Sequence, residues 1–502
     1  MNKKSSGIIL HPISFFGRFA SGDLGDEAKK VIDWLKKAGQ SYLQILPIGP
    51  TGYGNSPYQS FSAFAGNPYF ISLEKLFQKG LLTKEELSNY PKANPTQVDY
   101  RILESFNLKL FKKAYERFTA SGNMSKFDEF CYNNSGWLND YSDFMSLQDF
   151  FKGISWNNWS LEYEDRESYI KKSKYINDKK RFHEFLQFEF YEQWQDFKKY
   201  AGDNKIKLIG DLPIFVSYDS ADVWANKELF LLDDKGNPDV VAGVPPDYFS
   251  ETGQLWGNPI YNWDVMKNNN FVWWKERIRH ILKFVDCVRI DHFRGFEAYW
   301  EIPSGEKTAI NGRWVKAPGK EFFDSLKDEY KDKLPEIIIA EDLGIITDEV
   351  KELRDYFQLP GMRVFEFADF GEVGNGSKEL HHDYFPDNYI ERCIAYLGTH
   401  DNDTFLGWFD TLGDDIQQNV LRYLNITKPD DLNYSAIKKI ADSNAGKVIY
   451  LMQDALSLGT ECRMNTPGTC GDHNWSWRVT KDLLTDEIAE RLFSITKNSG
   501  RV

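Results

Sequence analysis

Cysteine is scarce in this chain, and long apolar runs and a net positive charge are absent. Five cysteines among 502 residues are few, odd in number and widely scattered, so we expect free thiols and a reducing compartment rather than a disulfide framework. No stretch approaches the roughly 18 consecutive apolar residues of a membrane-spanning helix. The apolar run at Gly7–Leu10 is too short for a signal peptide. These features predict a cytoplasmic protein.

The charge balance and the missing motifs exclude further classes. The chain has 61 basic and 75 acidic residues, a net charge of −14. Phosphate backbones and anionic membrane surfaces attract basic proteins, so we expect neither nucleic acid nor a membrane as a partner. No phosphate-binding glycine loop follows a strand. None of the eight histidines lies in an H-E-x-x-H pair or a similar spacing, so we expect no metal, although histidines beside carboxylates keep a metal site as a competing hypothesis.

Aromatic residues, in contrast, are abundant. The 15 Trp, 26 Tyr and 37 Phe make up 16% of the chain. Most should belong to a large core, because the burial of aromatic rings contributes strongly to folding. Some could instead present flat faces to ligands such as sugars. Composition alone leaves both interpretations open.

Short apolar runs alternate with amphipathic helical patterns along the chain, which predicts βαβ units and a parallel sheet. Eight such units predict an α/β fold of the (β/α)8 TIM-barrel type, with helical and loop insertions around the carboxyl-terminal rim. An open doubly wound sheet is the alternative, and the missing phosphate loop disfavours it. The eight candidate strands, of which the last could also be a helix, are 7–11, 42–47, 206–211, 285–291, 337–341, 362–367, 393–399 and 448–458.

Two segments are expected to be insertions into a single catalytic barrel that spans residues 1–502. Residues 73–200 are mainly helical in pattern and rich in Asn, Lys and Glu. Residues 225–275 contain the stretch Gly243–Trp263, in which Gly, Pro, Asp and aromatic residues are dense. Such a composition is typical of a turn-rich loop, and we expect this insertion to be a lid over the active site.

Three candidate strands end in acidic residues: Asp291, Glu341 and Asp401. In a barrel of this type the reacting groups lie at the carboxyl ends of the strands, so the three should converge on one opening. Two facing carboxyl groups suit glycoside chemistry, in which one attacks the sugar carbon and the other protonates the leaving oxygen. Arg289 lies two residues before Asp291 and should point the same way, keeping Asp291 ionised. Asp342 should point elsewhere, as a cap or a loop anchor.

Longer motifs surround these strand ends. They are Leu46-Pro-Ile-Gly-Pro-Thr-Gly-Tyr53-Gly-Asn-Ser56-Pro-Tyr58-Gln-Ser60, Gly243-Val-Pro-Pro-Asp247-Tyr-Phe-Ser-Glu251-Thr-Gly-Gln254-Leu-Trp256-Gly-Asn-Pro259, Arg289-Ile-Asp291-His-Phe-Arg-Gly295, Ala340-Glu341-Asp-Leu-Gly344, Gly398-Thr-His400-Asp401-Asn402 and Asn465-Thr-Pro-Gly-Thr469. In sequence and order, across essentially the whole chain, they resemble the 4-α-glucanotransferases called amylomaltases or disproportionating enzymes. These form glycoside hydrolase family 77 and are relatives of the α-amylases.

The resemblance implies a role for each residue. Asp291 would be the nucleophile that forms a covalent glucosyl-enzyme, Glu341 the general acid and then the base, and Asp401 a ligand of sugar hydroxyls that favours ring distortion. It implies maltooligosaccharide and α-glucan donors and acceptors as partners, and no cofactor. The further substrate contacts that it implies are Tyr53, Ser56, Tyr58, Asp211, Asp247, Gln254, Trp256, Arg289, His400 and Asn465.

The same acidic residues also bear on the alternative functions. An α-glucan hydrolase would use the same acidic trio, so it is the main alternative. A non-catalytic glucan-binding barrel would be expected to have lost Asp291 or Glu341, and both are present. Small departures from the family pattern, at Asn55 and at Asn474–Arg478, leave the preferred glucan length open. The sequence thus predicts a retaining 4-α-glucanotransferase.

Overall fold

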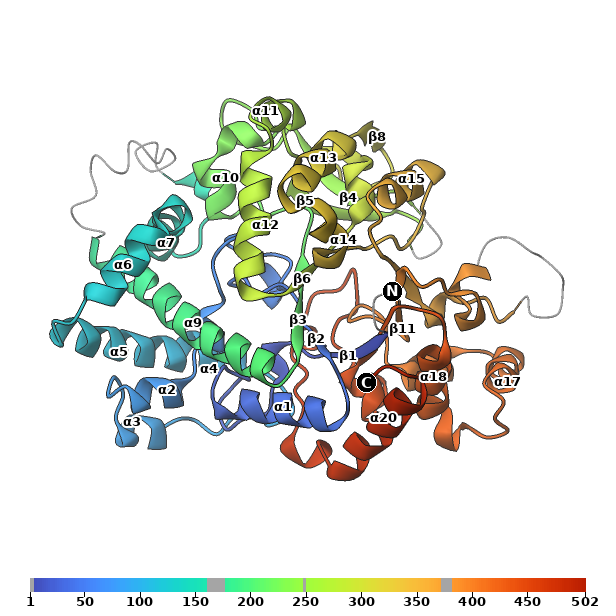
Figure 1. Ribbon diagram of the computed structural model, residues 1–502. Coiled ribbons are helices and arrows are strands. Elements are labelled where there is room, and N and C mark those ends of the chain that lie inside the picture. Colours follow the sequence, from blue (N-terminus) through green and yellow to red (C-terminus); the bar gives the residue numbers. More distant parts are fainter. Residues whose placement is uncertain (1–3, 160–176, 247–249, 372–381) are drawn as a thin grey trace.

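Eight parallel strands form a nearly closed barrel in the computed structural model, which describes residues 4–159, 177–246, 250–371 and 382–502 (Figure 1). The strand order β10-β11-β12-β1-β2-β3-β6-β9 confirms the predicted (β/α)8 fold. At the one open seam, Ala340 N in β9 donates to Pro360 O at 2.9 Å. The strands are β1 (Ser5–Ile9), β2 (Tyr42–Gln44), β3 (Lys207–Leu212), β6 (Cys287–Ile290), β9 (Ile338–Ala340), β10 (Gly361–Val364), β11 (Cys393–Tyr396) and β12 (Lys447–Leu451).

The strands are apolar on both faces because the barrel has two separate cores. In β6, Val288 and Ile290 belong to the core shared with the surrounding helices, whereas Cys287 belongs to the core inside the barrel. Side chains alternate along a strand, so Arg289 also points inward. The ambiguous segment 448–458 is resolved as the strand β12 followed directly by a short helix, α19 (Met452–Ala455).

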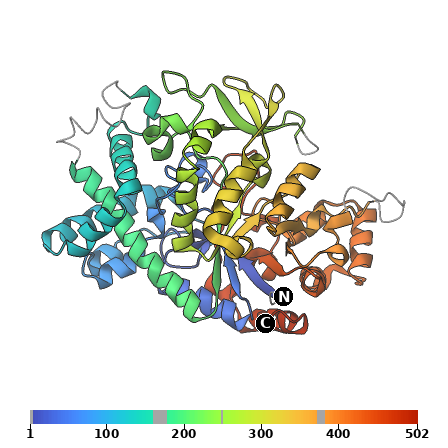
Figure 2. The same cartoon turned by 45° about the horizontal axis from the view of Figure 1, so that its top comes forward.

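Helices surround the barrel and connect its strands (Figures 1 and 2). Between successive strands lie α1 (Asp26–Lys37), α9 (Asn177–Asp203), α12 (Val272–Phe284), α13 (Gly319–Tyr330), α14 (Leu334–Ile337), α15 (Asp348–Tyr356), α16 (Phe405–Thr411), α17 (Asp414–Tyr423) and α18 (Leu432–Asp442), and α20 (Asp486–Asn498) follows β12. Within the described residues, no helix combines the length and the apolar character needed to cross a bilayer.

The described part of residues 73–200 is helical. Its helices are α2 (Leu73–Gln78), α3 (Lys84–Ser88), α4 (Tyr100–Ile102), α5 (Leu108–Ala120), α6 (Ser125–Asn133) and α7 (Ser135–Phe150), followed by α9. Aromatic rings hold this group together: Phe188 of α9 lies 5.7 Å from Phe127 and 5.6 Å from Phe130, centroid to centroid. Much of the aromatic excess is therefore core packing, the first of the two interpretations that composition left open.

A second, four-stranded antiparallel sheet was not predicted. Its order is β5-β4-β7-β8, and it lies at one end of the barrel, forward in Figure 2. The stretch Gly243–Trp263 contains β5 and the last two residues of its antiparallel partner β4, and is thus part of a β-hairpin and not only a loop. The strands are β4 (Val240–Val244), β5 (Gln254–Pro259), β7 (Ala298–Pro303) and β8 (Arg313–Lys316), and α10 (Ala221–Ala225) and α11 (Trp263–Asn268) lie nearby in sequence.

Candidate active site

The three acidic residues predicted to converge do line one open cleft, which has an empty volume of about 1430 Å³. Asp291 directly follows β6, Glu341 directly follows β9, and Asp401 lies on the loop after β11. Parallel strands of a barrel end at the same rim, and this geometry brings together residues that are far apart in sequence. The cleft is also lined by Tyr53, Ser56, Tyr58, Gln254, Trp256 and Asn465.

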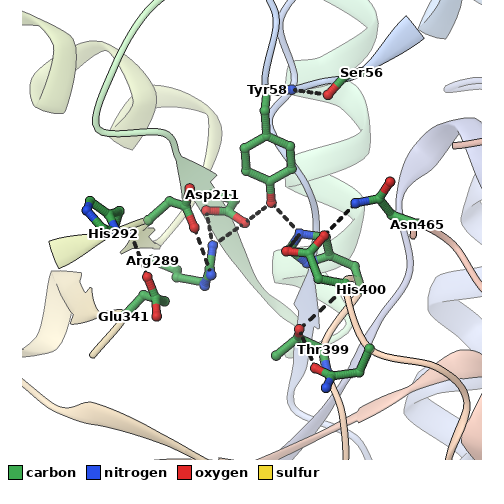
Figure 3. A network of polar contacts seen from close by, with 12 residues as sticks. Ser56, Tyr58, Asp211, Arg289, His292, Glu341, Thr399, His400 and Asn465 are labelled. Atoms are coloured by element: carbon green, nitrogen blue, oxygen red, sulfur yellow. Dashed lines mark hydrogen bonds and ion pairs between the residues drawn. The ribbon is translucent and has the colours of Figure 1, made fainter. Parts of the chain in front are cut away.

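A buried ion pair between Asp211 and Arg289, both labelled in Figure 3, supports Asp291. Arg289 and Asp211 are direct neighbours on β6 and β3. The Arg289 guanidinium donates to both carboxylate oxygens of Asp211 at 2.8 Å and contacts Asp291 Oδ1 at 2.9 Å. Arg289 and Asp211 are almost fully buried, while the Asp291 side chain keeps 29% of its surface exposed to the cleft. The predicted common direction of Arg289 and Asp291 is confirmed.

The two central carboxyl groups have different proton affinities. Burial raises the pKa of Asp291 to about 6, and the positive charge of Arg289 opposes that rise. Burial raises the pKa of Glu341 further, to about 7, again against the effect of Arg289. Desolvation is the larger effect at both groups. At Asp291 the Arg289 guanidinium acts in the predicted direction, because it favours the ionised form.

Backbone amides fix the orientation of Glu341. Its Oε2 accepts a hydrogen bond from His292 N at 2.7 Å, and its Oε1 accepts one from Leu343 N at 2.8 Å. His292 has a left-handed backbone conformation, with φ of 52°, which turns its amide toward Glu341. Since His292 directly follows Asp291, the same bond ties the loops that carry the two carboxyl groups together.

A chain of polar contacts crosses the cleft floor from Asp211 to Asn465 (Figure 3). The Tyr58 hydroxyl donates to Asp211 Oδ2 at 2.8 Å and lies 2.7 Å from His400 Nε2. His400 Nε2 is also 3.3 Å from Asp401 Oδ2, and Asn465 Nδ2 donates to Asp401 Oδ1 at 2.6 Å. Because the tyrosine hydroxyl gives its proton to Asp211, Nε2 of His400 must supply the proton shared with Tyr58.

Aromatic side chains form one wall and the outer edge of the cleft. The Trp256 indole lies 4.9 Å from the His292 ring, edge to face, and its nitrogen donates to Gln254 Oε1 at 3.2 Å. Tyr53 is 80% exposed, and Ser56 Oγ accepts from Tyr58 N at 3.3 Å. Both belong to the loop after β2. Predicted residue Asp247 lies outside the described residues.

Three residues that no motif had singled out as substrate contacts also shape the cleft. His292 positions Glu341 through its backbone, and Trp475 packs against Tyr58 with ring centroids 5.7 Å apart. Arg463 donates to the backbone oxygen of Asp401 at 2.7 Å. His292 could have been found from its place directly after the proposed nucleophile. Trp475 lies in the segment Asn474–Arg478, which was noted as a departure from the family pattern, whereas nothing in the local sequence distinguishes Arg463.

Asp342 has a different role from its neighbour Glu341. It is buried, accepts a hydrogen bond from Met362 N at 2.6 Å, and forms an ion pair with Arg354. It thereby anchors β10 beside β9, as the prediction of a loop anchor requires. Among the described residues, no group of three His, Cys, Asp or Glu side chains is placed to hold a metal ion.

Comparison with known proteins identifies the family. Residues 10–485 match the family of 4-alpha-glucanotransferases, glycoside hydrolase family 77. The chain belongs to this family. It is 46% identical to a 4-alpha-glucanotransferase of Synechocystis, over 100% of this chain and 99% of that one, and 43% identical to one of Clostridium butyricum, over 98% and 100%. The amylomaltase of Streptococcus agalactiae, solved in complex with acarbose, superimposes with a TM-score of 0.94 at 36% identity, over 99% of this chain and 100% of that one.

Membership of the 4-alpha-glucanotransferase family establishes the reaction class. The enzyme transfers glucosyl units of α-glucans, the activity of EC 2.4.1.25. The predicted family, fold and enzyme class are therefore confirmed. The roles of individual residues in the cleft stay predictions, which the geometry above makes specific.

Proposed function

We propose that this enzyme moves α-1,4-glucan segments between maltooligosaccharides by a retaining double displacement at Asp291 and Glu341. The observation that carries the proposal is the pair of carboxyl groups in one cleft, of which Asp291 loses its proton more readily than Glu341. An ionised and a protonated carboxyl group, side by side, are what the first step of retaining glycoside chemistry needs.

In the first step, an ionised Asp291 oxygen attacks the anomeric carbon of the donor glucan. The glycosidic C–O bond breaks, and Glu341 gives its proton to the departing 4-oxygen. Covalent attack of this kind calls for carboxyl groups about 5–5.5 Å apart. The hydrogen bond from His292 N to Glu341 supports that closeness, since His292 is bonded to Asp291 in the chain.

In the second step, the roles at Glu341 reverse. Glu341, now ionised, accepts the proton of an acceptor 4-hydroxyl, the oxygen attacks the anomeric carbon, and the ester to Asp291 breaks. Two inversions leave the α-configuration unchanged. Arg289 supports the second step, because its positive charge stabilises Asp291 as it leaves as a carboxylate.

The polar chain on the cleft floor is suited to holding sugar hydroxyls. Asp401 keeps 45% of its side-chain surface exposed, although Asn465 and His400 orient it. Oriented acceptors and donors of this kind fix a flexible ligand at little further cost in entropy. We assign Tyr58, His400, Asp401 and Asn465 to the sugar that reacts, and Asp401 to its distortion.

Transfer should outrun hydrolysis, because an acceptor sugar stacked on Trp256 is close to the ester and excludes water. Trp256→Ala is expected to raise the ratio of hydrolysis to transfer roughly tenfold and to lower the overall rate. With maltotriose, the parent enzyme should yield glucose and a ladder of longer chains, with almost no gain in reducing ends.

The measurement is product length together with reducing ends over time. Trp314→Ala is the matched control, since Trp314 is exposed on the same antiparallel sheet but does not line the cleft. A steady rise in reducing ends without longer products in the parent enzyme would mean that the alternative, an α-glucan hydrolase, is correct.

Activity should depend on pH with a maximum between the two pKa values. Raising the pH through the Glu341 pKa, about 7, removes the proton that the leaving group needs. Lowering the pH through the Asp291 pKa, about 6, neutralises the nucleophile. A plot of kcat/KM for maltotriose against pH should therefore be bell-shaped. A rate that keeps rising beyond about pH 8 would contradict the assignment of Glu341 as the acid.

The location of the enzyme stays a prediction. All five cysteines are free thiols, as predicted: Cys131, Cys287, Cys393, Cys462 and Cys470. Free thiols fit a reducing compartment, and we retain the cytoplasm as the proposed location.

A further inference from the structure

A second groove lies on the outside of the barrel and is lined by residues of α7 and α12, two helices that Figure 1 labels. Its empty volume is about 1060 Å³, and it shares no lining residue with the catalytic cleft. None of the motifs quoted above includes a residue of this groove. It therefore needs an explanation of its own.

Two helical stripes form its long walls. On α12 the lining residues Trp273, Glu276, His280 and Lys283 recur every three or four positions, and so occupy one side of the helix. From Trp273 to Lys283 this stripe is about 15 Å long, at 1.5 Å per residue. Gly136, near the start of α7, lines the opposite wall. The groove is thus elongated, a shape that suits a chain better than a compact metabolite.

The inner surface of the groove is aromatic. Trp137 of α7 is only partly buried, and its ring lies 5.1 Å from that of His280, edge to face. Phe64 lies 5.3 Å from His280 and 6.0 Å from Trp273, again edge to face. Trp273 and His280 are themselves buried, with 8% and 7% of their surface exposed, and they hold in place the partly buried rings of Trp137 and Phe64, which are the rings that can meet a ligand.

Amides and carboxylates surround these rings. Asn133 and Asn226 line the groove, as do Asp140 and Glu276. Arg279 also lines the groove, but its guanidinium is engaged elsewhere, because its Nη2 donates to Glu329 Oε2 at 2.7 Å. Three acids, Asp140, Asp222 and Glu276, stand against two cations, Arg279 and Lys283, so the lining has no positive surplus for an anionic ligand. Aromatic faces flanked by hydrogen-bonding groups suit a neutral, polyhydroxylated one.

We propose that this groove holds a stretch of α-glucan chain that is outside the catalytic cleft. The inference rests on α-glucans as the substrate class, but not on the proposed roles of Asp291 and Glu341. A long glucan anchored here would raise the local concentration of chain ends at the cleft, without changing the chemistry there. Maltotriose is too short to occupy both sites and would gain nothing.

Two substitutions test the groove from opposite directions. Trp137→Ala removes the stacking face. Gly136→Leu fills the groove, and it should be tolerated because a Cβ at Gly136 would meet no other atom within 4 Å. Both variants should raise KM for soluble amylose roughly threefold to tenfold, leaving kcat and the kinetics with maltotriose unchanged. Both should also migrate faster than the parent in native gels that contain amylose.

Matched controls separate the groove from general damage. Gly136→Ala adds only a methyl group, and Tyr132→Ala removes an 80% exposed ring of α6 that does not line the groove. Both should behave as the parent does. Parent-like KM and migration in Trp137→Ala and Gly136→Leu would overturn the inference, as would equal losses with amylose and maltotriose. If the parent failed to transfer at all, the proposed function would fall, while slower migration of the parent than of both variants would still support the groove.

Discussion

Asp291→Asn is expected to lower kcat for transfer from maltotriose by about 10⁴-fold or more, in line with the loss of other catalytic nucleophiles. The amide is nearly the same size as the carboxyl group but cannot form a glucosyl ester. The fold should persist, because Arg289 keeps both of its hydrogen bonds to Asp211. The thermal unfolding midpoint should therefore stay close to that of the parent.

Asp286→Asn is the matched control for this experiment. Asp286 lies just before β6, at the opposite end of the strand from Asp291, and its Oδ2 accepts a hydrogen bond from Leu208 N at 2.7 Å. An asparagine oxygen can accept the same bond, so this variant should keep near-parental activity. Turnover by Asp291→Asn above about one per cent of the parental rate, in protein free of parental enzyme, would exclude Asp291 as the nucleophile.

The barrel could be predicted because its strands are buried on both faces. Such strands appear in sequence as short apolar runs. The helices between them are recognised by apolar residues that recur every three or four positions. The ends of these apolar runs can also be located in the sequence, so Asp291 and Glu341 could be placed at one rim of the barrel from sequence alone. The second sheet escaped prediction for the opposite reason. Most residues of β5 and β8 are not fully buried, so these strands do not appear as apolar runs, and β5 contains Gly257 and ends at Pro259.

The proton affinities could not be predicted, since they depend on a balance that only three-dimensional structure fixes. Arg289 favours the ionised form of Asp291 as expected, but no sequence pattern shows that desolvation has the larger influence on the pKa of Asp291. The partner of Glu341 was hidden for another reason. His292 acts through its backbone nitrogen, which every residue except proline has, so its only signal in the sequence is its place directly after Asp291.

The groove between α7 and α12 could not be predicted from the sequence either. Trp137 and Trp273 are 136 residues apart, on helices separated by α9, α10 and α11. Each by itself has the sequence context of a core aromatic residue. Only the packing around His280 and Phe64 places both beside the same open volume.

Glu341→Gln should be the second most damaging change, and its pattern distinguishes an acid–base from a nucleophile. Glutamine can neither protonate the leaving oxygen nor deprotonate the acceptor, so transfer from maltotriose should fall by about 10²- to 10⁴-fold. α-Glucosyl fluoride has a leaving group that needs no proton, and the first step with it should be nearly intact. The glucosyl ester of Asp291 should then accumulate, because no base activates the acceptor, and intact-protein mass spectrometry should detect it.

The matched control for that change is Glu366→Gln. Glu366 is also buried at the end of a barrel strand, β10, but does not line the cleft. Burial raises its pKa well above the usual range, so its surroundings favour the uncharged form, and glutamine is uncharged and of nearly the same size. This variant should keep most of the parental activity. Equal losses of Glu341→Gln with maltotriose and with α-glucosyl fluoride, without an accumulated ester, would show that Glu341 supports the site structurally and donates no proton to the leaving group.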